Sequence, residues 1–354
     1  MSGTSRFAVL VLVVAAAVAA CGSGASDAPR RSASTGPAVS QAGGLPLSRA
    51  VGRKIVSGMA GTFPSRSLRE RVRRGHVGGV ILFGPNVGPS LTRAIAALQR
   101  AARAGGNPPL LVAVDQEGGQ VKRLQPLPPS RAPAEMSAAV AGPEGAATGR
   151  ALLARGINTN LAPVADVNHG SFLGSRSFGS DPALVAAAAC AFATGLQSAG
   201  VNATLKHFPG LGRTTENTDL HAVRVTASAR GLRADLEPYR RCGGRARLVM
   251  VSNATYPAFD PERPAVFSRR IVTDLLRGEL RFGGVTVTDT LAAPGVAGPT
   301  ASVRATRAGI DLLLYVDEDS SERGYRSVLR AAQAGRLSHA AIAASAARID
   351  ALAR

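Results

Sequence analysis

Short apolar runs alternate with longer amphipathic segments along most of the chain. Several runs hold consecutive β-branched or Leu residues, a pattern typical of strands that are buried on both faces. The runs occupy residues 54–60, 78–84, 109–115, 158–166, 203–207, 247–253, 284–289 and 311–317. Nearly every gap between them is long enough for a helix, most plainly the Ala-rich segment 182–200. Eight such units over about 300 residues predict a single (β/α)8 barrel of the TIM type.

Many of these runs end in a polar or ionisable residue, namely Asp115, Asp166, His207, Asn253, Asp289 and Asp317. The carboxyl ends of all the strands of such a barrel open on one face, where the active site lies. We therefore expect these side chains to converge, although they are far apart in the sequence. Asp and Asn also begin βα loops as turn formers, so only part of the set is expected to be functional.

The first 46 residues follow a different pattern. Arg6 precedes an apolar run over residues 7–20, which is shorter than the about 20 residues of a transmembrane helix and is typical of a secretory signal. Its end, Val18-Ala19-Ala20-Cys21, resembles a bacterial lipobox. That resemblance implies cleavage before Cys21 and lipidation of its thiol; the alternative is an ordinary signal peptide with a coincidental Cys.

The segment after Cys21 is rich in Gly, Ser, Ala and Pro and cannot form a core, so it is expected to be a flexible tether. The predicted organisation is a lipoprotein signal peptide at 1–20, a lipidated Cys and tether at 21–46, and one barrel domain at 47–354. Such a protein would lie outside the cytoplasm, anchored to the cell membrane.

Two further cysteines, Cys190 and Cys242, could pair in an oxidising compartment. Cys190 lies in an Ala-rich helical pattern, where a buried free thiol fits equally well. The sequence leaves both alternatives open.

The net charge of +19 comes almost entirely from Arg, with 39 Arg against 3 Lys. The Arg residues are scattered along the chain, as expected from a genome that favours Arg codons. A modest attraction to anionic lipid or cell-wall polymer is compatible with this charge. Nucleic-acid binding is not expected, because an export signal is present and a basic motif with interleaved aromatic residues is not found.

A ring of carboxylates with His, Lys and Arg nearby suits hydrolysis of a glycosidic bond. Asp289, at the end of its strand, is the candidate nucleophile. The segment LKHFPGLGRTTENTDLH at 205–221 holds a candidate proton donor, His221, with Asp219 two residues before it. A carboxylate beside an imidazole orients the ring and raises its pKa.

Five segments, at 114–124, 156–168, 174–182, 206–212 and 287–291, resemble family 3 glycoside hydrolases, and AGIDLLL at 308–314 extends the match. The similarity is greatest to the single-barrel β-N-acetylglucosaminidase branch. It implies a retaining hydrolase that releases terminal β-linked N-acetylglucosamine from cell-wall fragments through a glycosyl-aspartate intermediate. It also implies no metal and no organic cofactor, and we expect a monomer.

Carried over by position, the resemblance assigns the nucleophile to Asp289 and sugar contacts to Asp115, Arg123, Arg176, Lys206 and His207. The composition supports Lys206 independently. In a chain that uses Arg thirteen times as often as Lys, a Lys indicates a point charge that the guanidinium fork does not replace.

Two departures from the family pattern bear on activity. Gln120 stands where the family usually has Arg, and Leu211 replaces the His of the GHG segment. The loop that carries Asp219 and His221 is also two residues longer than usual. His221 is therefore the expected acid/base only if this loop delivers it to the barrel mouth; Glu216 is another possible donor.

Two alternative functions are compatible with the same barrel. A lipid-anchored protein on the same barrel could bind wall sugars without cutting them. A metal-dependent hydrolase using His207, Asp219, His221 and Asp289 is disfavoured, because their spacing matches no common ligand motif.

Overall fold

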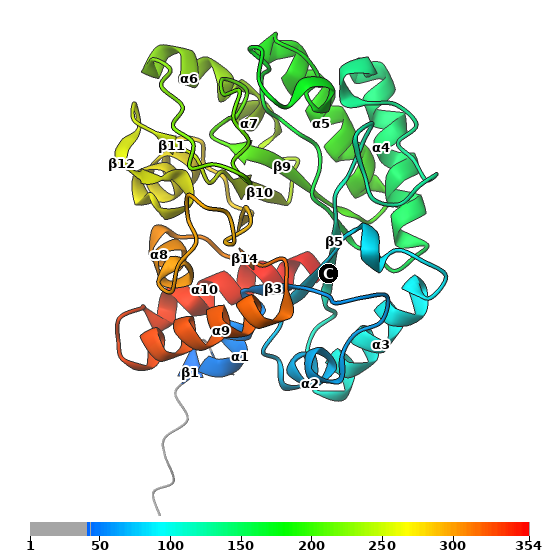
Figure 1. Ribbon diagram of the computed structural model, residues 1–354, viewed down its shortest axis with the longest axis vertical. Helices are drawn as coiled ribbons and strands as arrows, with labels where there is room; N and C mark the ends of the chain where they lie inside the picture. The colour runs from blue at the N-terminus through cyan, green and yellow to red at the C-terminus, as the bar shows by residue number, and fades with distance from the viewer. Residues whose placement is uncertain (1–40, 43, 354) are drawn as a thin grey trace, which may run out of the picture. The chain divides into compact units, whose positions relative to one another are not determined.

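Eight parallel strands form the centre of the structure (Figure 1). The computed structural model describes residues 41–42 and 44–353, so the predictions for the signal peptide, Cys21 and most of the tether lie outside the described residues. The strands are β3 (Ile55–Gly58), β4 (Gly79–Leu82), β5 (Leu111–Val114), β8 (Thr159–Asn160), β9 (Asn202–Phe208), β10 (Leu248–Val251), β13 (Val285–Thr288) and β14 (Leu313–Leu314). Each falls inside or overlaps one of the eight predicted runs.

The strands follow the order β13-β10-β9-β8-β5-β4-β3-β14, so the first and last strands of the barrel, β3 and β14, are neighbours. A parallel bridge between Val287 and Leu312 joins the two ends of the sheet. The sheet is thereby nearly closed, and the predicted (β/α)8 barrel is confirmed.

Helices surround this sheet (Figure 1). They are α1 (Leu47–Arg53), α2 (Arg66–Arg74), α3 (Leu91–Ala104), α4 (Ala138–Leu153), α5 (Pro182–Ser198), α6 (Ala229–Asp235), α7 (Glu237–Cys242), a π-helical segment (Arg270–Glu279), α8 (Ala301–Ala308), α9 (Glu318–Gln333) and α10 (His339–Asp350). The segment predicted as a helix at 182–200 is α5. Its start is fixed by Asp181, whose side chain accepts hydrogen bonds from two backbone N–H groups of the first turn, and by Pro182 at the first position.

Side chains on both faces of the strands are buried, which explains the continuous apolar runs. In β4, for example, Ile81 belongs to the cluster inside the barrel, whereas Val80 and Leu82 pack against the surrounding helices. The inner cluster also contains Ile349 and Leu352, from the end of α10 and the residues after it. The other buried members of this cluster lie in the eight strands or next to them in sequence.

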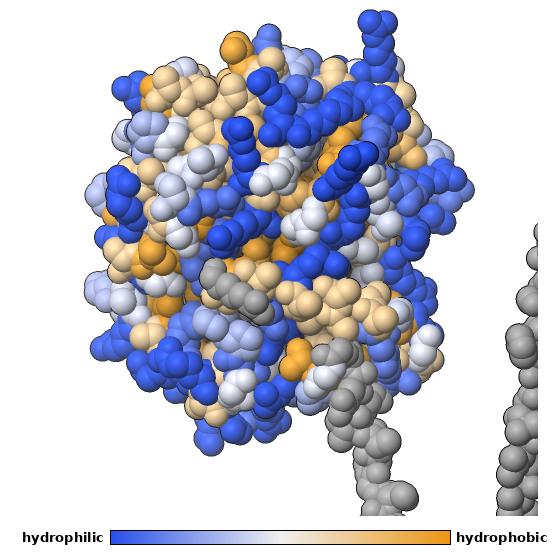
Figure 2. All heavy atoms as spheres, turned by 180° about the vertical axis from the view of Figure 1, so that it is seen from behind, coloured by the Kyte–Doolittle hydropathy of each residue, from blue (hydrophilic) through white to orange (hydrophobic). Residues whose placement is uncertain are grey.

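A short ribbon of two strands lies before α1. Strand β1 (Gln41–Ala42) pairs with β2 (Leu45–Pro46) in a short antiparallel ribbon within the last residues of the segment predicted as a tether. Among the described residues, no helix combines the length and apolar character that crossing a bilayer requires. On the side opposite to the view of Figure 1, hydrophilic residues cover much of the surface and hydrophobic ones appear between them in small groups (Figure 2).

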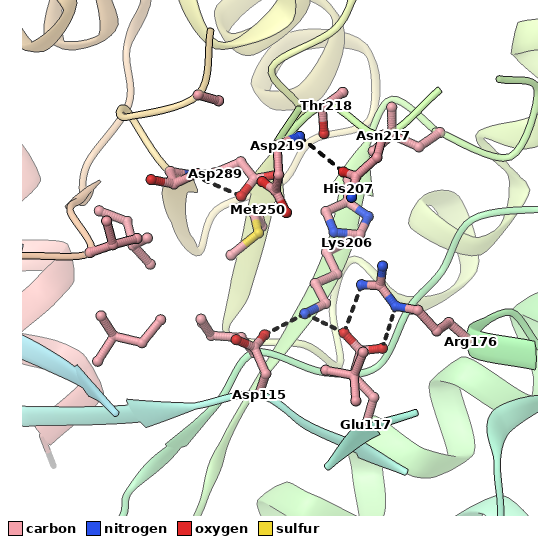
Figure 3. A pocket seen from close by; sticks show the side chains of 18 of the residues that line it. Asp115, Glu117, Arg176, Lys206, His207, Asn217, Thr218, Asp219, Met250 and Asp289 are labelled. Carbon is pink, nitrogen blue, oxygen red and sulfur yellow. Dashed lines mark hydrogen bonds and ion pairs between the residues drawn. The ribbon is translucent and has the colours of Figure 1, made fainter. Parts of the chain in front are cut away.

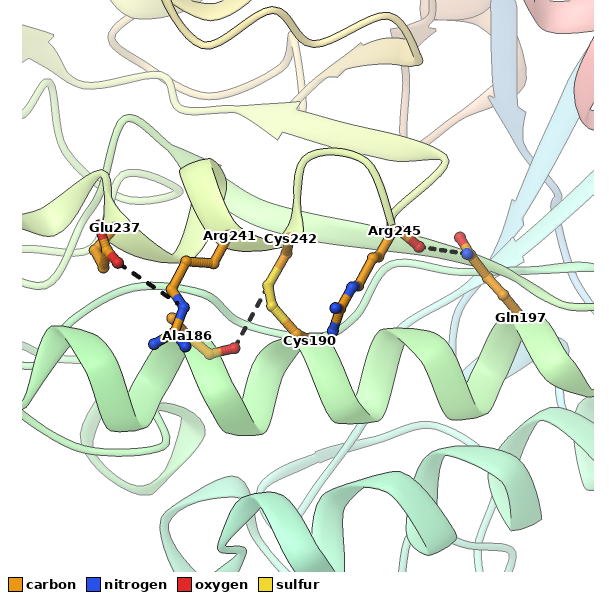
Figure 4. The surroundings of a disulfide bond; sticks show 7 residues. All are labelled: Ala186, Cys190, Gln197, Glu237, Arg241, Cys242 and Arg245. Carbon is orange, nitrogen blue, oxygen red and sulfur yellow. Dashed lines mark hydrogen bonds and ion pairs between the residues drawn. A yellow bond between two sulfur atoms is a disulfide. The ribbon is translucent and has the colours of Figure 1, made fainter.

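Cys190 in α5 and Cys242 in α7 form a disulfide, with their Cα atoms 5.1 Å apart (Figure 4). Both residues are buried in the layer between sheet and helices. This answers the question that the sequence left open: the bond fastens a short helix to the long helix beside it.

We expect Cys190→Ala/Cys242→Ala to unfold at a lower temperature than the native chain. The bridge closes a loop with a sequence separation of 52, and a loop of that size stabilises by about 4 kcal/mol in the chain-entropy model. Thermal unfolding followed by circular dichroism measures the difference. A reducing agent should lower the melting temperature of the native chain and leave that of the double variant unchanged. Equal melting temperatures of native chain and variant would contradict a stabilising role.

Candidate active site

A cavity of about 500 Å³ opens at the carboxyl ends of the strands. The cavity is lined by Lys206 and His207 of β9, together with Asp115 after β5 and Asp289 after β13. Its apolar wall includes Ile81, Leu161, Met250 and Leu314, and loops add Arg123, Arg176, Leu211 and Asp219. The predicted convergence of residues far apart in the sequence is therefore observed.

Lys206 is the centre of a buried ion-pair network on one side of this cavity (Figure 3). Its Nζ lies 2.6 Å from Oδ1 of Asp115 and 2.7 Å from Oε1 of Glu117. Arg176 donates two hydrogen bonds of 2.9 Å to the two oxygens of Glu117. Two cations thus share two carboxylates at the mouth of the barrel.

Mutual pairing keeps Glu117 and Lys206 charged although both are buried. Burial alone would raise the pKa of Glu117, but the Lys206 and Arg176 charges lower it to about 2. Burial would likewise lower the pKa of Lys206, yet the charges of Asp115 and Glu117 raise it. The cavity therefore presents fixed charges and hydrogen-bonding groups to a polar ligand.

His207 is oriented by Asp166 behind it. The Asp166 carboxylate accepts hydrogen bonds from the Nδ1 of His207, at 2.8 Å, and from its backbone N–H, at 3.1 Å. The same carboxylate accepts the backbone N–H of Leu211 at 2.7 Å. Because Nδ1 faces a carboxylate, the proton sits there, and Nε2 is left for the cavity.

Arg123 reaches the cavity from the segment after β6 (Gln116–Gly118). Its backbone N–H donates to the carbonyl oxygen of Asp115 at 3.3 Å. Its Nε is buried and has no hydrogen-bond partner among the described residues. The Arg123 side chain also lines the cavity, where its other N–H groups can donate to a ligand oxygen.

Asp289 follows β13 and faces the cavity. Its Oδ1 accepts the backbone N–H of Thr290 at 2.7 Å. Burial and the nearby charge of Asp219 raise the pKa of Asp289, while His207, Thr290 and Lys206 act in the opposite direction. Asp219 and Asp289 lie in the same part of the cavity, as Figure 3 shows.

The loop after β9 is fixed at its start. Leu211, which replaces the family's His, is buried in the apolar wall. Gly212 approaches the backbone of Val167 so closely that a Cβ would overlap its carbonyl oxygen. Arg213 then binds Asp235 of α6 at 2.5 Å.

The end of the same loop, which carries Asp219 and His221, does not have the arrangement predicted from the sequence. Asp219 lines the cavity, but His221 is exposed and is not among the residues that line it. The backbone N–H groups of these two residues both bond to Asn217. Within the described part of the chain, the His221 ring makes no hydrogen bond to Asp219. The predicted pair is therefore not assembled in this conformation, and the role of His221 stays a prediction.

The other strand-end residues have structural partners. Asn253 donates a hydrogen bond to the carbonyl of Thr290, beside Asp289. Asp317 accepts the backbone N–H of Ser320 and begins α9. Gln120 is exposed and does not line the cavity, so its replacement of Arg lies at the periphery.

Sequence reasoning did not single out Glu117 as a site residue, and it treated Asp166 only as a strand end. Glu117 lies two residues after Asp115, where side chains of an extended segment point the same way. That spacing was the available signal. Over residues 41–42 and 44–353, no cluster of three His, Cys, Asp or Glu side chains is arranged to hold a metal, although His207, Asp219 and Asp289 line the same cavity.

Comparison with known proteins agrees with this geometry. Residues 51–352 match the glycosyl hydrolase family 3 N terminal domain. A beta-hexosaminidase of Pseudomonas aeruginosa is 39% identical over 280 residues, which cover 74% of this chain and 82% of that protein.

Two solved structures are similar in fold and sequence. A glycoside hydrolase family 3 beta-N-acetylglucosaminidase from Paenibacillus sp. has a TM-score of 0.83 and 35% identity, covering 87% of this chain. This chain spans 62% of that longer protein. A beta-N-acetylhexosaminidase from Beutenbergia cavernae has a TM-score of 0.79 and 34% identity, covering 87% of this chain and 98% of that one.

We expect Glu117→Gln to destabilise the chain by about 3–5 kcal/mol at neutral pH, because it leaves two buried cations with one carboxylate fewer. The folded pKa of about 2 lies below the ordinary 4.5. The contribution of Glu117 is therefore complete above pH 4.5 and is lost as the pH falls toward 2. Urea unfolding at pH 7 and pH 3 measures both effects.

The matched control is Glu262→Gln, because Glu262 is exposed and its substitution should change little. The native chain and Glu117→Gln should differ less at pH 3 than at pH 7. An equal difference at the two pH values would show that the Glu117 charge does not stabilise the fold.

Proposed function

Because the chain belongs to glycosyl hydrolase family 3, we propose that it is a glycoside hydrolase that removes terminal β-linked N-acetylglucosamine, or a related β-sugar, from glycans. One observation carries this proposal: Asp289 faces the same cavity as the network of Asp115, Glu117, Arg176 and Lys206. The carboxylate of Asp289 and this ion-pair network, which we call the polar clamp, would therefore contact the same bound sugar.

The clamp binds the hydroxyl groups of the terminal sugar. Asp115 and Lys206 offer an acceptor and a donor 2.6 Å apart, which suits neighbouring hydroxyls. Arg123 adds a donor and the Nε2 of His207 adds an acceptor from other sides of the cavity. Since packing and ion pairs hold these groups in place, little ordering is needed when the sugar binds.

The reaction is a two-step displacement with retention of configuration. Asp289 attacks the anomeric carbon, and the bond from that carbon to the glycosidic oxygen breaks. That oxygen takes a proton from an acid on the enzyme and leaves as an alcohol. Water then attacks the glycosyl-aspartate, transfers a proton to the same group, and frees Asp289. No electrons are exchanged, and the acid/base ends in its starting state.

The proton donor lies in the segment from Asn217 to His221. Asp219 is the carboxyl group of this segment that lines the cavity, close enough to affect the pKa of Asp289. His221, predicted as the donor with Asp219 behind it, has to turn inward before it can act. We favour Asp219 as the donor, with His221 as the alternative that a rearranged loop would provide.

The cellular setting is a further part of the proposal. We infer an exported, lipid-anchored monomer that acts on cell-wall glycan fragments. The signal-like residues 6–20 and the lipobox-like end at Cys21 support the anchor. The disulfide of Cys190 and Cys242 supports an oxidising compartment outside the cytoplasm.

A second candidate function is sugar binding without cleavage on the same barrel. The exposed position of His221 and the replacement of the usual His by Leu211 favour it. In that case the clamp would bind the sugar and proton donation would be too weak for turnover.

We expect Asp219→Asn to lower kcat on a β-linked N-acetylglucosaminyl disaccharide about 10²–10⁴-fold, the usual contribution of a general acid. Hydrolysis of an aryl β-N-acetylglucosaminide should fall much less, because its leaving group needs little protonation. His221→Ala should stay close to the native chain on both substrates, and Asp289→Asn should be inactive on both. Steady-state kinetics on the two substrates measure these effects.

The outcomes separate the alternatives. A large loss on the disaccharide for His221→Ala would assign the donor to His221. Retained sugar binding without turnover of either substrate by the native chain would establish the binding function and refute the hydrolase.

We expect Cys21→Ser to move the protein from the membrane fraction to the soluble extracytoplasmic fraction, because the thiol that carries the lipid is removed. Cell fractionation followed by immunoblotting measures the distribution. An unchanged membrane fraction would contradict lipidation at Cys21. Cys190→Ala/Cys242→Ala is the matched control, since it removes the other two cysteines and leaves Cys21 in place.

A further inference from the structure

Helices α2 and α3 lie side by side on the outside of the barrel, and both carry several arginines (Figure 1). Residues 66–104 contain eight Arg and a single acidic residue, Glu70. Seven of these arginines are exposed: Arg66, Arg69, Arg73, Arg74, Arg93, Arg100 and Arg103. The arginines that look scattered in the sequence are thus gathered on one face by the pairing of two helices.

A groove of about 740 Å³ runs between the two helices. Its walls hold Arg66, Arg69, Arg73, Arg74 and Arg100, and α3 contributes Ala97, Ala101 and Ala104. These three alanines are spaced so that they share one face of α3. Because their side chains are short, they leave a groove with an apolar floor and cationic walls. We name this feature the arginine groove; it shares no lining residue with the active-site cavity.

Only part of the charge in the arginine groove is neutralised. Glu70 binds Arg73 at 2.8 Å and Arg74 at 2.7 Å. The side chains of Arg66 and Arg100 form no hydrogen bond or ion pair with any residue that the structure describes, and that of Arg69 bonds only to the carbonyl of Ser65. Three guanidiniums of like charge therefore line one groove without a carboxylate partner, and an anion between them would relieve their repulsion.

An aromatic ring lies before the start of α2. Phe63 is 40% exposed, and the guanidinium carbons of Arg69 and Arg93 lie 6.0 and 5.9 Å from its ring centre. Guanidinium groups at this distance from an aromatic ring are attracted to its face. The ring offers an apolar face next to the guanidiniums.

We propose that the arginine groove binds an anionic glycan, with its carboxylate or phosphate groups on the arginines and its sugar rings on the alanine floor and Phe63. Arg suits this ligand because its planar fork donates two parallel hydrogen bonds to such groups. A concave groove along two helices fits a linear chain better than a flat bilayer. The site would hold the protein on an acidic polymer independently of the catalytic cavity.

The test is binding of a fluorescent decameric oligogalacturonate to the full chain, measured by anisotropy at low and at moderate salt. The variant Arg66→Gln/Arg69→Gln/Arg100→Gln removes the three arginines without a carboxylate partner. Its matched control, Arg150→Gln/Arg230→Gln/Arg270→Gln, removes three exposed arginines outside the groove, so that both variants have the same net charge. We expect the groove variant to bind about tenfold or more weakly and the control to bind like the native chain.

Further experiments test which chemical features of the ligand the groove recognises. A neutral dextran oligosaccharide of the same length should not bind. Phe63→Ala should weaken the binding of oligogalacturonate and leave the binding of short-chain inorganic polyphosphate unchanged. Addition of salt should weaken native binding more steeply than binding by the groove variant. The melting temperatures of all variants check that each is folded.

Three results would overturn the proposal. Equal losses in the groove variant and its control would mean attraction by net charge alone. Binding of anionic phospholipid vesicles, but not oligogalacturonate, that depends on the groove would assign the surface to a bilayer. Absence of oligogalacturonate binding by the native chain would exclude the site. None of these measurements uses glycan hydrolysis, so the proposed glycan-binding groove is tested independently of the proposed hydrolase activity.

Discussion

A buried ammonium group determines how the mouth of this barrel is built. Lys206 is almost fully buried, and a charge in that position is tolerated only if carboxylates surround it. Asp115 and Glu117 meet that requirement, but two carboxylates for one cation would leave an excess negative charge. Arg176 supplies the second cation through Glu117. The four groups together connect β9 to the end of β5 and to the loop before α5. The polar side of the cavity therefore also holds these three parts of the chain together.

The same arrangement explains why some features were predictable from sequence and others were not. Strands of a closed barrel are buried on both faces, so their continuous apolar runs identify all eight. Strand ends share one face, so Asp115, His207 and Asp289 could be expected together. Glu117 and Asp166 were harder to recognise, because their roles come from partners more than 40 residues away in sequence.

Other properties depend entirely on tertiary arrangement. The pairing of Cys190 with Cys242 follows from α7 lying on α5, which no local pattern encodes. The clustering of arginines follows from the contact of α2 with α3. The exposure of His221 follows from a loop fixed at Leu211, Gly212 and Arg213 but longer at its end. Asp219 and His221 have the residue types and nearly the spacing of the family pattern, but this pattern alone does not determine where the His221 side chain points.

The contribution of the last helix to the inner cluster affects when the barrel can fold during synthesis. Ile349 and Leu352 belong to the inner cluster, yet they follow all eight strands in the chain. β14 must also reach β3, the first strand of the barrel, before the sheet can close. The interior of the barrel therefore cannot be completed until the last residues of the chain have been synthesised. Late closure of the barrel is compatible with the export proposed above, because translocation of an unfolded chain requires that folding be completed afterwards.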